Sequence, residues 1–301
     1  MNVLSLFDGI SCGQVALERA GIKVDNYFAS EIDKHAIKVT MKNYPNTIQL
    51  GDVTKISYKN GVLYSENGKF NVGKIDLLIG GSPCQGFSFA GKQLNFEDPR
   101  SKLFFEYERI LKEINPEYFL LENVKMKKEY KDVISECLNV EPIMINSSLV
   151  CAAERKRYYW SNIPNITQPN DLKIILKDIV IDATKVPEKY WYDREFVYNG
   201  DDKKVQCTLN IKGHRQMKEV YNLNAKCNTL TCDGNGGNLQ KKVYQNGKCR
   251  KLMPIEYERL QTLPDNYTDC VSDSRRYTAI GNGWTVDVIA HIFTGLIQGG
   301  D

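Results

Sequence analysis

The chain lacks the sequence features of a membrane or secreted protein. None of its apolar runs approaches the roughly 18 residues that a membrane-spanning helix needs. No basic region precedes the first apolar residues, so we expect no signal peptide. The nine cysteines are scattered and contain no Cys-x-x-Cys pair, which favours reduced thiols over a disulfide framework or a structural zinc site. We therefore expect a cytoplasmic protein with neither a membrane nor a metal among its partners.

The chain also lacks a large net charge, but its charged residues are unevenly distributed. The formal net charge is +3. Residues 203–251 alone contain eleven Lys and Arg against two acids. Such a segment is typical of a surface that meets a polyanion, although an ordinary solvated basic surface would have the same composition.

The first 125 residues alternate strand patterns with helix patterns. Apolar runs predict strands, and amphipathic stretches between them predict helices. This alternation indicates an α/β fold with a mainly parallel sheet. The expected strands are Val3–Phe7, Tyr27–Ser30, Ile75–Ile79 and Tyr118–Leu121, and the expected helices are one through Val15 that stops at Gly21, Ile32–Tyr44 and Lys102–Ile114.

The pattern changes in the second half of the chain. Residues 163–248 contain Asn-Gly and Gly-Gly turns between short polar segments, which predicts a small, loop-rich and largely β domain. Helical patterns return at Pro254–Thr262 and Trp284–Ile297. We therefore predict one domain from residues 1–162 and 249–301, interrupted by an inserted domain.

Polar residues follow the first three strands. Phe7–Ser11 comes after the first strand and opens a helix, where unpaired backbone N–H groups can hold a ligand. It is not a Gly-x-Gly-x-x-Gly motif, so a dinucleotide is disfavoured. Glu31 follows Tyr27–Ser30, and Asp52 follows a further strand that precedes Ile75–Ile79. Acids at such strand ends can accept hydrogen bonds from ribose hydroxyls or an adenine amino group. Turn glycines and solvated acids are the simpler explanation of each feature taken alone.

A cysteine and a glutamate follow the two later strands. Cys84 comes directly after Pro83 in a glycine-rich loop, which suits an exposed and rigidly placed nucleophile. Glu122 caps the next strand, at the sheet edge where ligands bind in open α/β folds. Such a carboxyl can bond to or protonate a ring nitrogen while the thiolate adds to carbon. Arg155 and Arg157 alternate on a further predicted strand, where they can hold a carbonyl oxygen and a phosphate, or form structural salt bridges.

Taken in order, these motifs resemble those of the DNA cytosine-5 methyltransferase family. The resemblance covers residues 1–162 and 249–301. A few details, such as Trp284 after Gly283, also resemble the catalytic domain of eukaryotic de novo enzymes, whereas the loop after Cys84 is similar to bacterial and phage members. The matching motifs are Phe7-Asp8-Gly9, Gly51-Asp52-Val53, Ser82-Pro83-Cys84-Gln85, Phe96–Arg100, Leu103–Glu106, Glu122-Asn123-Val124, Arg155-Lys156-Arg157, Arg250–Pro254 with Glu258–Gln261, and Gly281-Asn282-Gly283.

The resemblance implies a reaction and a role for each matched residue. S-adenosylmethionine would donate the methyl group, leaving S-adenosylhomocysteine, and Cys84 would add to C6 of a cytosine flipped out of double-stranded DNA. Glu122 would hold N3 and the exocyclic amine, and Arg157 would hold O2. Arg155 would contact nearby backbone or active-site acids, and Asn123 would support the loop. The cofactor would be held by Phe7, Asp8, Gly9, Ile10, Glu31, Ile32, Asp52, Val53, Pro83, Leu103, Asn282, Gly283 and Trp284.

The implied fold is the mixed, Rossmann-like sheet of S-adenosylmethionine-dependent methyltransferases, with helices on both faces. Residues 163–248 would then be the target-recognition domain. There we expect a lysine such as Lys241 to contact phosphate, and Arg215 or the Thr229–Asn238 loops to reach base edges. Ala153 stands where many members have glutamine, which affects one support contact.

Several alternatives stay open at this point. A transferase of the same fold could act on cytosine in tRNA, which is also a polyanion. A non-catalytic, methyltransferase-like DNA-binding or regulatory protein is a second alternative, but it would be expected to have lost Cys84, Glu122 or Arg157. The target sequence, a cognate restriction nuclease and the base that removes the C5 proton are undetermined. We expect a prokaryotic or phage enzyme in the cytoplasm, and a monomer in preference to an oligomer.

Overall fold

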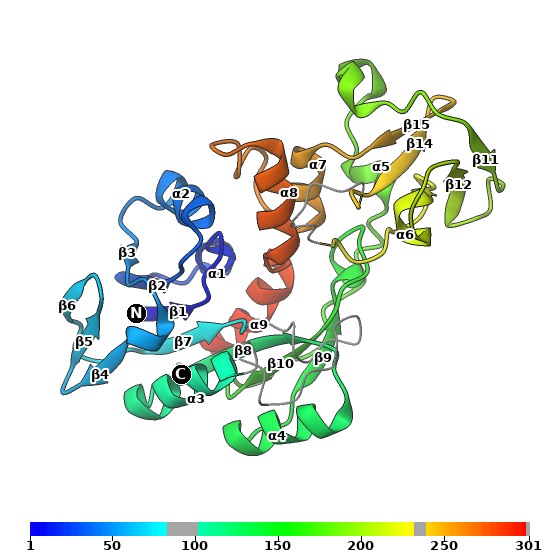
Figure 1. Ribbon diagram of the computed structural model, residues 1–301. Helices are drawn as coiled ribbons and strands as arrows, with labels where there is room; N and C mark the ends of the chain where they lie inside the picture. Colours follow the sequence, from blue (N-terminus) through cyan, green and yellow to red (C-terminus); the bar gives the residue numbers. More distant parts are fainter. Residues whose placement is uncertain (83–101, 232–238, 299–301) are drawn as a thin grey trace. The chain divides into compact units, whose positions relative to one another are not determined.

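The chain forms two compact units, each with its own sheet (Figure 1). Each unit also has its own buried apolar cluster. The computed structural model describes residues 1–82, 102–231 and 239–298. The first unit consists of Met1–Ile145, Lys156–Gln168 and Val288–Asp301, and the second unit of Asn146–Arg155 and Pro169–Asp287.

A seven-stranded sheet forms the centre of the first unit. In space its strands follow the order β3-β2-β1-β7-β8-β10-β9. β1 is parallel to β2 and β7, and β7 is parallel to β8, whereas β10 is antiparallel to β8. The sheet is therefore mixed, as the resemblance implied. Its strands are β1 (Asn2–Leu6), β2 (Asn26–Ser30), β3 (Ile48–Gln49), β7 (Leu77–Gly80), β8 (Tyr118–Val124), β9 (Ile143–Asn146) and β10 (Lys156–Ser161).

Helices cover both faces of this sheet. Figure 1 shows α1 (Cys12–Arg19) and α2 (Lys34–Asn43) on one side, and α3 (Lys102–Ile114) and α4 (Lys128–Leu138) on the other. A further helix, α9 (Val286–Gln298), belongs to this unit from Val288 onward. Residues three or four apart share one face of a helix, so the apolar residues of α3 form one stripe. This stripe is buried in the same apolar cluster as residues of the sheet. The buried members of that stripe are Phe104, Tyr107, Ile110 and Ile114.

α2 begins two residues later than the sequence pattern predicted. The side chain of Asp33 accepts hydrogen bonds from the backbone N–H groups of His35 at 2.7 Å and Ala36 at 3.4 Å. Asp33 is therefore the N-cap, and it satisfies donors that the first turn of a helix leaves without an intrahelical partner. The two preceding residues, Glu31 and Ile32, stay outside the helix at the end of β2.

A small antiparallel sheet that the sequence analysis did not predict follows Asp52. A short 3₁₀ helix, η1 (Val53–Lys55), leads into β4 (Ser57–Lys59), β5 (Val62–Ser65) and β6 (Gly68–Asn71). Asn60 and Gly61 connect β4 to β5 with φ values of 51° and 79°, the left-handed values of a two-residue hairpin turn. We call these three strands the meander.

The second unit contains a five-stranded sheet with the order β11-β12-β13-β14-β15. Neighbouring strands are antiparallel except β13 and β14. This unit is loop-rich, as predicted, and its other elements are short. The strands are β11 (Phe196–Tyr198), β12 (Val205–Leu209), β13 (Glu219–Tyr221), β14 (Lys242–Gln245) and β15 (Lys248–Lys251). The helices are α5 (Leu176–Ile179), α6 (Arg215–Lys218), α7 (Pro254–Leu260) and α8 (Asp273–Asn282), with 3₁₀ helices at Ser147–Leu149, Ala183–Lys185 and Glu188–Tyr190.

The compact units differ from the predicted domain limits at the C-terminal side. Residues 249–287 cluster with the second unit, and only the part of α9 from Val288 onward joins the first. A buried ion pair explains this. Arg250 of β15 donates to both carboxylate oxygens of Glu256 in α7, at 2.6 and 2.8 Å, and both side chains are fully buried. Glu256 also accepts from the backbone N–H of Ile181 at 2.8 Å, which ties α7 to the second unit.

Candidate active site

The turn after β1 has an unusual backbone. Phe7, Gly9 and Ser11 have φ values of 57°, 59° and 56°. Non-glycine residues rarely adopt these values, and such strain is concentrated at ligand-binding turns. A Cβ atom placed on Gly9 would meet no atom within 4 Å, so the turn borders open space. Of the other predicted cofactor residues here, Ile10 is buried.

Glu31 connects this turn to the end of β2. Its Oε2 accepts from the backbone N–H of Gly9 at 2.8 Å, and its Oε1 accepts from Ile32 at 2.7 Å and Asp33 at 2.8 Å. An ionised carboxylate offers about four acceptor positions, so these three bonds leave capacity for a ligand hydroxyl. Ile32 is 76% exposed, which places an apolar side chain in solvent beside that carboxylate. The open turn, the carboxylate and the exposed apolar side chain fit a nucleoside such as that of S-adenosylmethionine.

Asp8 lies in the same turn with an enclosed carboxyl group. Tyr27 donates to its Oδ1 at 2.8 Å, and the hydroxyl of Ser11 donates to its Oδ2. Burial raises the pKa of Asp8 to about 6, an effect that these hydrogen bonds oppose and the nearby Glu31 reinforces. The protonation of this turn therefore changes in mildly acidic solution.

Asp52 caps η1 after β3. Its Oδ1 accepts from the backbone N–H and the hydroxyl of Thr54, both at 2.9 Å, whereas its Oδ2 accepts no hydrogen bond from the residues that the structure describes. Val53 is buried beneath this turn. Leu103, at the start of α3, is partly buried and packs on the same apolar cluster as Val53. These positions are compatible with the predicted cofactor contacts, and they all lie in the first unit.

Glu122 and Arg157 form an ion pair on neighbouring strands. Nε of Arg157 lies 2.8 Å from Oε1 of Glu122, and their side chains are 13% and 10% exposed. The antiparallel register sets Arg157 opposite Val124 and Tyr159 opposite Glu122, which brings the two charges together near the end of β8. The structure thus places side by side the two residues that the sequence analysis assigned to ring recognition.

A side-chain hydrogen bond joins the end of β8 to the segment that follows β7. Nδ2 of Asn123 donates to Oγ of Ser82 at 3.1 Å, and both residues are buried. Oδ1 of Asn123 accepts from the backbone N–H of Val124 at 2.8 Å. Asn123 therefore holds Ser82, the residue that precedes Pro83 and Cys84 in the sequence. Those two predicted site residues lie outside the described residues.

Arg155 does not share a strand face with Arg157, because β10 begins only at Lys156. Its guanidinium donates to the backbone carbonyls of Gly281 at 3.2 Å and Gly283 at 3.0 Å. The expectation of two alternating arginines on one strand is therefore wrong, whereas the implied backbone contact of Arg155 is present. Arg155 belongs to the second unit. Its guanidinium supplies the hydrogen-bond donors that the backbone carbonyls of Gly281 and Gly283 need there.

Gln261 also holds the segment 281–285, in addition to Arg155. Gln261 belongs to one of the matching motifs, but the resemblance implied no role for it. Nε2 of Gln261 donates to the carbonyls of Ile280 and Gly283, both at 3.0 Å, and its Oε1 accepts from Thr285 at 2.7 Å. Within this segment Gly283 is buried, Trp284 is half-buried and Asn282 is exposed. All three predicted cofactor residues of this segment lie in the second unit.

Part of the predicted polyanion surface is buried. Lys241 is 3% exposed, and Lys242 and Arg250 are fully buried. Burial lowers the pKa of Lys241 and lowers that of Lys242 to about 8. The predicted phosphate contact of Lys241 is therefore wrong, because its side chain packs inside the second unit. The sequence pattern could not separate these cations from solvated ones.

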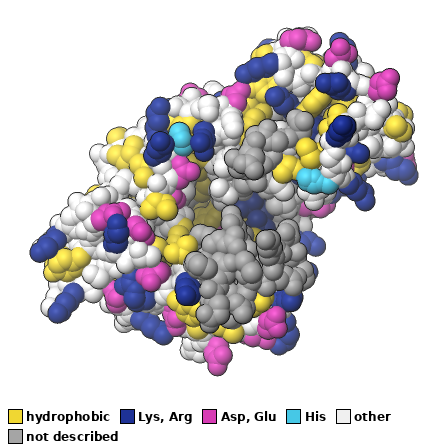
Figure 2. All heavy atoms as spheres, viewed as in Figure 1, with side chains coloured by type: hydrophobic (Ala, Val, Ile, Leu, Met, Phe, Trp, Pro, Cys, Tyr) yellow, Lys and Arg dark blue, Asp and Glu magenta, His cyan; other side chains and the backbone are white. Residues whose placement is uncertain are grey.

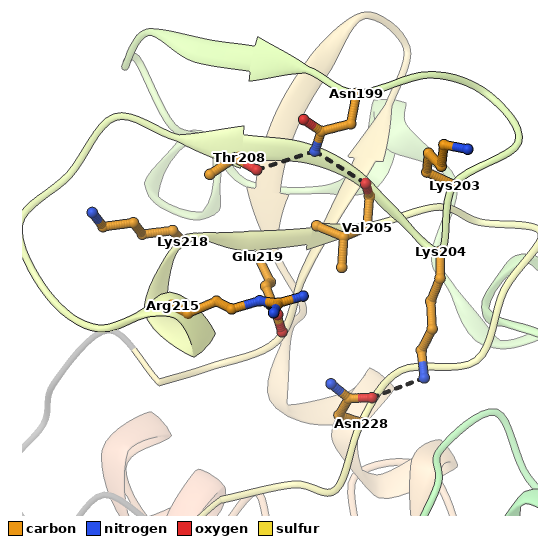
Figure 3. Close-up of a pocket in the computed structure, with 9 residues that line it drawn as sticks. All are labelled: Asn199, Lys203, Lys204, Val205, Thr208, Arg215, Lys218, Glu219 and Asn228. Atoms are coloured by element: carbon orange, nitrogen blue, oxygen red, sulfur yellow. Dashed lines mark hydrogen bonds and ion pairs between the residues drawn. The ribbon is translucent and has the colours of Figure 1, made fainter.

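The remaining cations include several around an open groove of about 810 Å³ in the second unit (Figure 3). Figure 3 shows the guanidinium of Arg215 against Glu219, and the ammonium of Lys204 against Asn228. The Arg215 side chain is 88% exposed, and its Nε lies 3.0 Å from Oε1 of Glu219. On the face drawn in Figure 2, Lys and Arg are more prominent than Asp and Glu over this unit. The lining residues are Asn199, Lys203, Lys204, Val205, Thr208, Arg215, Lys218, Glu219 and Asn228.

Within residues 1–82, 102–231 and 239–298, no three His, Cys, Asp or Glu side chains come together as a metal site would require. None of the helices in those ranges is both long and apolar enough to cross a membrane. The seven cysteines in those ranges are free thiols.

Comparison with known proteins points to one family. The model of the C-5 cytosine-specific DNA methylase family matches residues 1–140 and 149–298. The chain is 31% identical to type II methyltransferase M1.ScrFI of Lactococcus lactis subsp. cremoris, over 99% of this chain and 78% of that protein. It is 29% identical to type II methyltransferase M.HhaI of Haemophilus parahaemolyticus, over 97% of this chain and 93% of that protein. The solved structure of the Entamoeba histolytica methyltransferase EhMeth has the same fold, with a TM-score of 0.74 at 19% identity over 100% of this chain and 99% of that one.

Proposed function

Because the chain belongs to the C-5 cytosine-specific DNA methylase family, it is a DNA cytosine-5 methyltransferase, and we propose the residues and steps by which it acts. The methyl donor is S-adenosylmethionine, and the acceptor is C5 of a cytosine in double-stranded DNA. The base is flipped out, because its reacting atoms are inaccessible in a stacked duplex. The observation that carries this proposal is the ion pair of Glu122 and Arg157. The residue after Glu122 is Asn123, whose side chain bonds to Ser82.

Cys84 is the proposed nucleophile. Its thiolate adds to C6, which makes C5 a nucleophile toward the electrophilic methyl group that the cofactor supplies. C5 then loses its proton, and elimination of the thiolate leaves 5-methylcytosine, with S-adenosylhomocysteine as the second product. The family match supports this role, as does the bond by which Asn123 holds Ser82 two residues before Cys84.

Glu122 and Arg157 are the proposed ring-binding residues. The Glu122 carboxyl bonds to N3 and the exocyclic amine of cytosine, which favours thiolate addition at C6 because it stabilises charge developing on the ring. Nε of Arg157 pairs with Glu122, and its Nη1 donates to the Lys156 carbonyl at 2.9 Å. A guanidinium has five N–H donors, so further donors can hold O2. Arg155 acts indirectly, through the Gly281 and Gly283 carbonyls.

The proposed cofactor site lies at the ends of β1, β2 and β3. Glu31 accepts hydrogen bonds from the ribose hydroxyls, and Asp52 accepts one from the adenine amino group. Ile32 covers an apolar face of the nucleoside, and the open turn at Gly9 leaves room for the rest of the ligand. The further proposed contacts are Phe7, Asp8, Ile10, Val53, Pro83, Leu103, Asn282, Gly283 and Trp284.

The proposed target-recognition surface is the groove of the second unit. Lys203 and Lys218 lie at phosphates, which position the duplex without reading its sequence. Arg215 reaches a base edge: Glu219 holds its Nε, and its Nη1 and Nη2 edge pairs with a guanine in the major groove.

Covalent trapping tests the proposed mechanism. DNA with 5-fluorocytosine at the target should form a stable adduct with the protein, because fluorine cannot leave C5 as a proton does. Cys84→Ala should form no adduct and transfer no methyl, yet still bind DNA, and tRNA offered in parallel should accept no methyl. Methyl transfer by Cys84→Ala at the wild-type rate would exclude the covalent route.

A further inference from the structure

The meander places a carboxylate against the turn that contains Asp52. Glu66 lies between β5 and β6, and its Oε1 accepts from the backbone N–H of Asp52 at 2.8 Å. Its Oε2 lies 2.5 Å from Nζ of Lys55, at the end of η1. Gly51 allows this approach, since its φ is 81° and a Cβ atom there would collide with Oε1 of Glu66. The contact therefore depends on the residue types on both sides.

The same turn is held on its other side by α3. Nη2 of Arg109 donates to the backbone carbonyl of Ile56 at 2.9 Å. The guanidinium is fixed in turn by Glu106 and Glu113, each at 2.7 Å. Glu113 also accepts from the backbone N–H of Tyr58 in β4 at 2.9 Å. Helix, meander and η1 thus form one connected network around a turn of a few residues.

We propose that Glu66 is a positioning residue that sets the affinity for the cofactor by holding the Asp52 and Val53 turn in its binding geometry. This inference rests on the proposed function, in which Asp52 and Val53 contact S-adenosylmethionine. A turn that is already ordered loses less conformational entropy when the ligand binds. Glu66 itself touches no substrate in this proposal, so its loss should alter cofactor binding and leave the chemical step unchanged.

Calorimetry with S-adenosylhomocysteine separates this role from others, because that ligand does not react. Glu66→Ala should raise its Kd about five- to tenfold, the range expected for losing one charge-assisted hydrogen bond at a partly exposed site. Glu66→Gln should stay within about twofold of the wild type, since the amide oxygen can still accept from Asp52. Lys55→Met, the matched control, removes only the exposed ion pair and should also stay within about twofold. The kcat at saturating cofactor and the KM for DNA should not change.

The outcomes distinguish this inference from the proposed function. A wild-type protein that binds no S-adenosylhomocysteine contradicts the proposed function. If the wild type binds S-adenosylhomocysteine and Glu66→Ala binds it equally tightly, the positioning role is wrong but the proposed function stands. A rise in the KM for DNA equal to the rise in Kd would also overturn it, because it would indicate general disruption. If Glu66→Ala does not fold, Glu66→Asp serves instead, because its shorter side chain withdraws the carboxylate from Asp52.

Discussion

Two groove lysines offer the sharpest test of how the second unit meets DNA. Lys203 is 61% exposed at its side chain and Lys218 is half-buried, and both line the groove. Lys241 belongs to the same basic segment but is only 3% exposed. We expect Lys203→Gln and Lys218→Gln each to remove one phosphate contact, and Lys241→Met to remove none.

The magnitude follows from counterion release. Each lost contact should flatten the slope of log K against log salt by ~0.9, which at 0.1 M salt corresponds to about eightfold weaker binding, or ~1.2 kcal/mol. The double variant of Lys203 and Lys218 should therefore lose ~1.8 from the slope. Lys241→Met should leave the slope unchanged, because a buried ammonium with a lowered pKa releases no counterion from DNA.

Fluorescence anisotropy with a labelled duplex between 50 and 200 mM salt measures these slopes. Arg215→Ala provides a contrast, since a base reader should relax preference at one position by ~1–3 kcal/mol with little change in slope. Unchanged slopes for both groove lysines would refute the groove as the phosphate-binding surface. If Lys241→Met flattens the slope of log K against log salt as much as the groove variants do, burial does not decide which lysines of this segment contact phosphate.

Two further predictions concern the first unit. Glu31→Ala should weaken cofactor binding by ~1–3 kcal/mol, because it removes a charge-assisted hydrogen bond to the ribose, whereas Glu122→Gln should leave cofactor affinity almost unchanged and lower turnover. Calorimetry and methyl-transfer rates measured on both variants check this, and the reverse pattern would mean that the two acids have exchanged roles. Because the pKa of Asp8 is raised, the folded state binds more protons than the unfolded chain between pH 3.8 and about 6. The contribution of Asp8 to the free energy of unfolding should therefore fall as pH rises through this window, by about 3 kcal/mol in total. Urea unfolding of wild type and Asp8→Asn from pH 4 to 7 checks it, since the difference between them should change across that window, and a constant difference would contradict the titration.

The sequence pattern was sufficient where structure depends on nearby residues. Helix α3 has the predicted limits, Lys102–Ile114, because its apolar stripe is read directly from the spacing of side chains. β8 begins at the predicted Tyr118 but continues to Val124. The meander was missed, since its strands are three or four residues long and half-exposed, so they lack a strong apolar pattern.

From the sequence by itself came the α/β class and the order of the motifs, and the family resemblance carried by those motifs implied the roles of the side chains proposed for chemistry. The fold class follows from local periodicity, turn residues and strand ends, which depend on a few neighbouring positions. Only the tertiary structure decided which charges meet. The strand register pairs Arg157 with Glu122 from 35 positions away, and packing removes Lys241 from the surface while leaving Arg215 exposed. It also brings Glu66 to Asp52 through a hairpin that the local sequence pattern did not predict. These outcomes depend on long-range packing and burial, which the charge and spacing of residues along the chain do not determine.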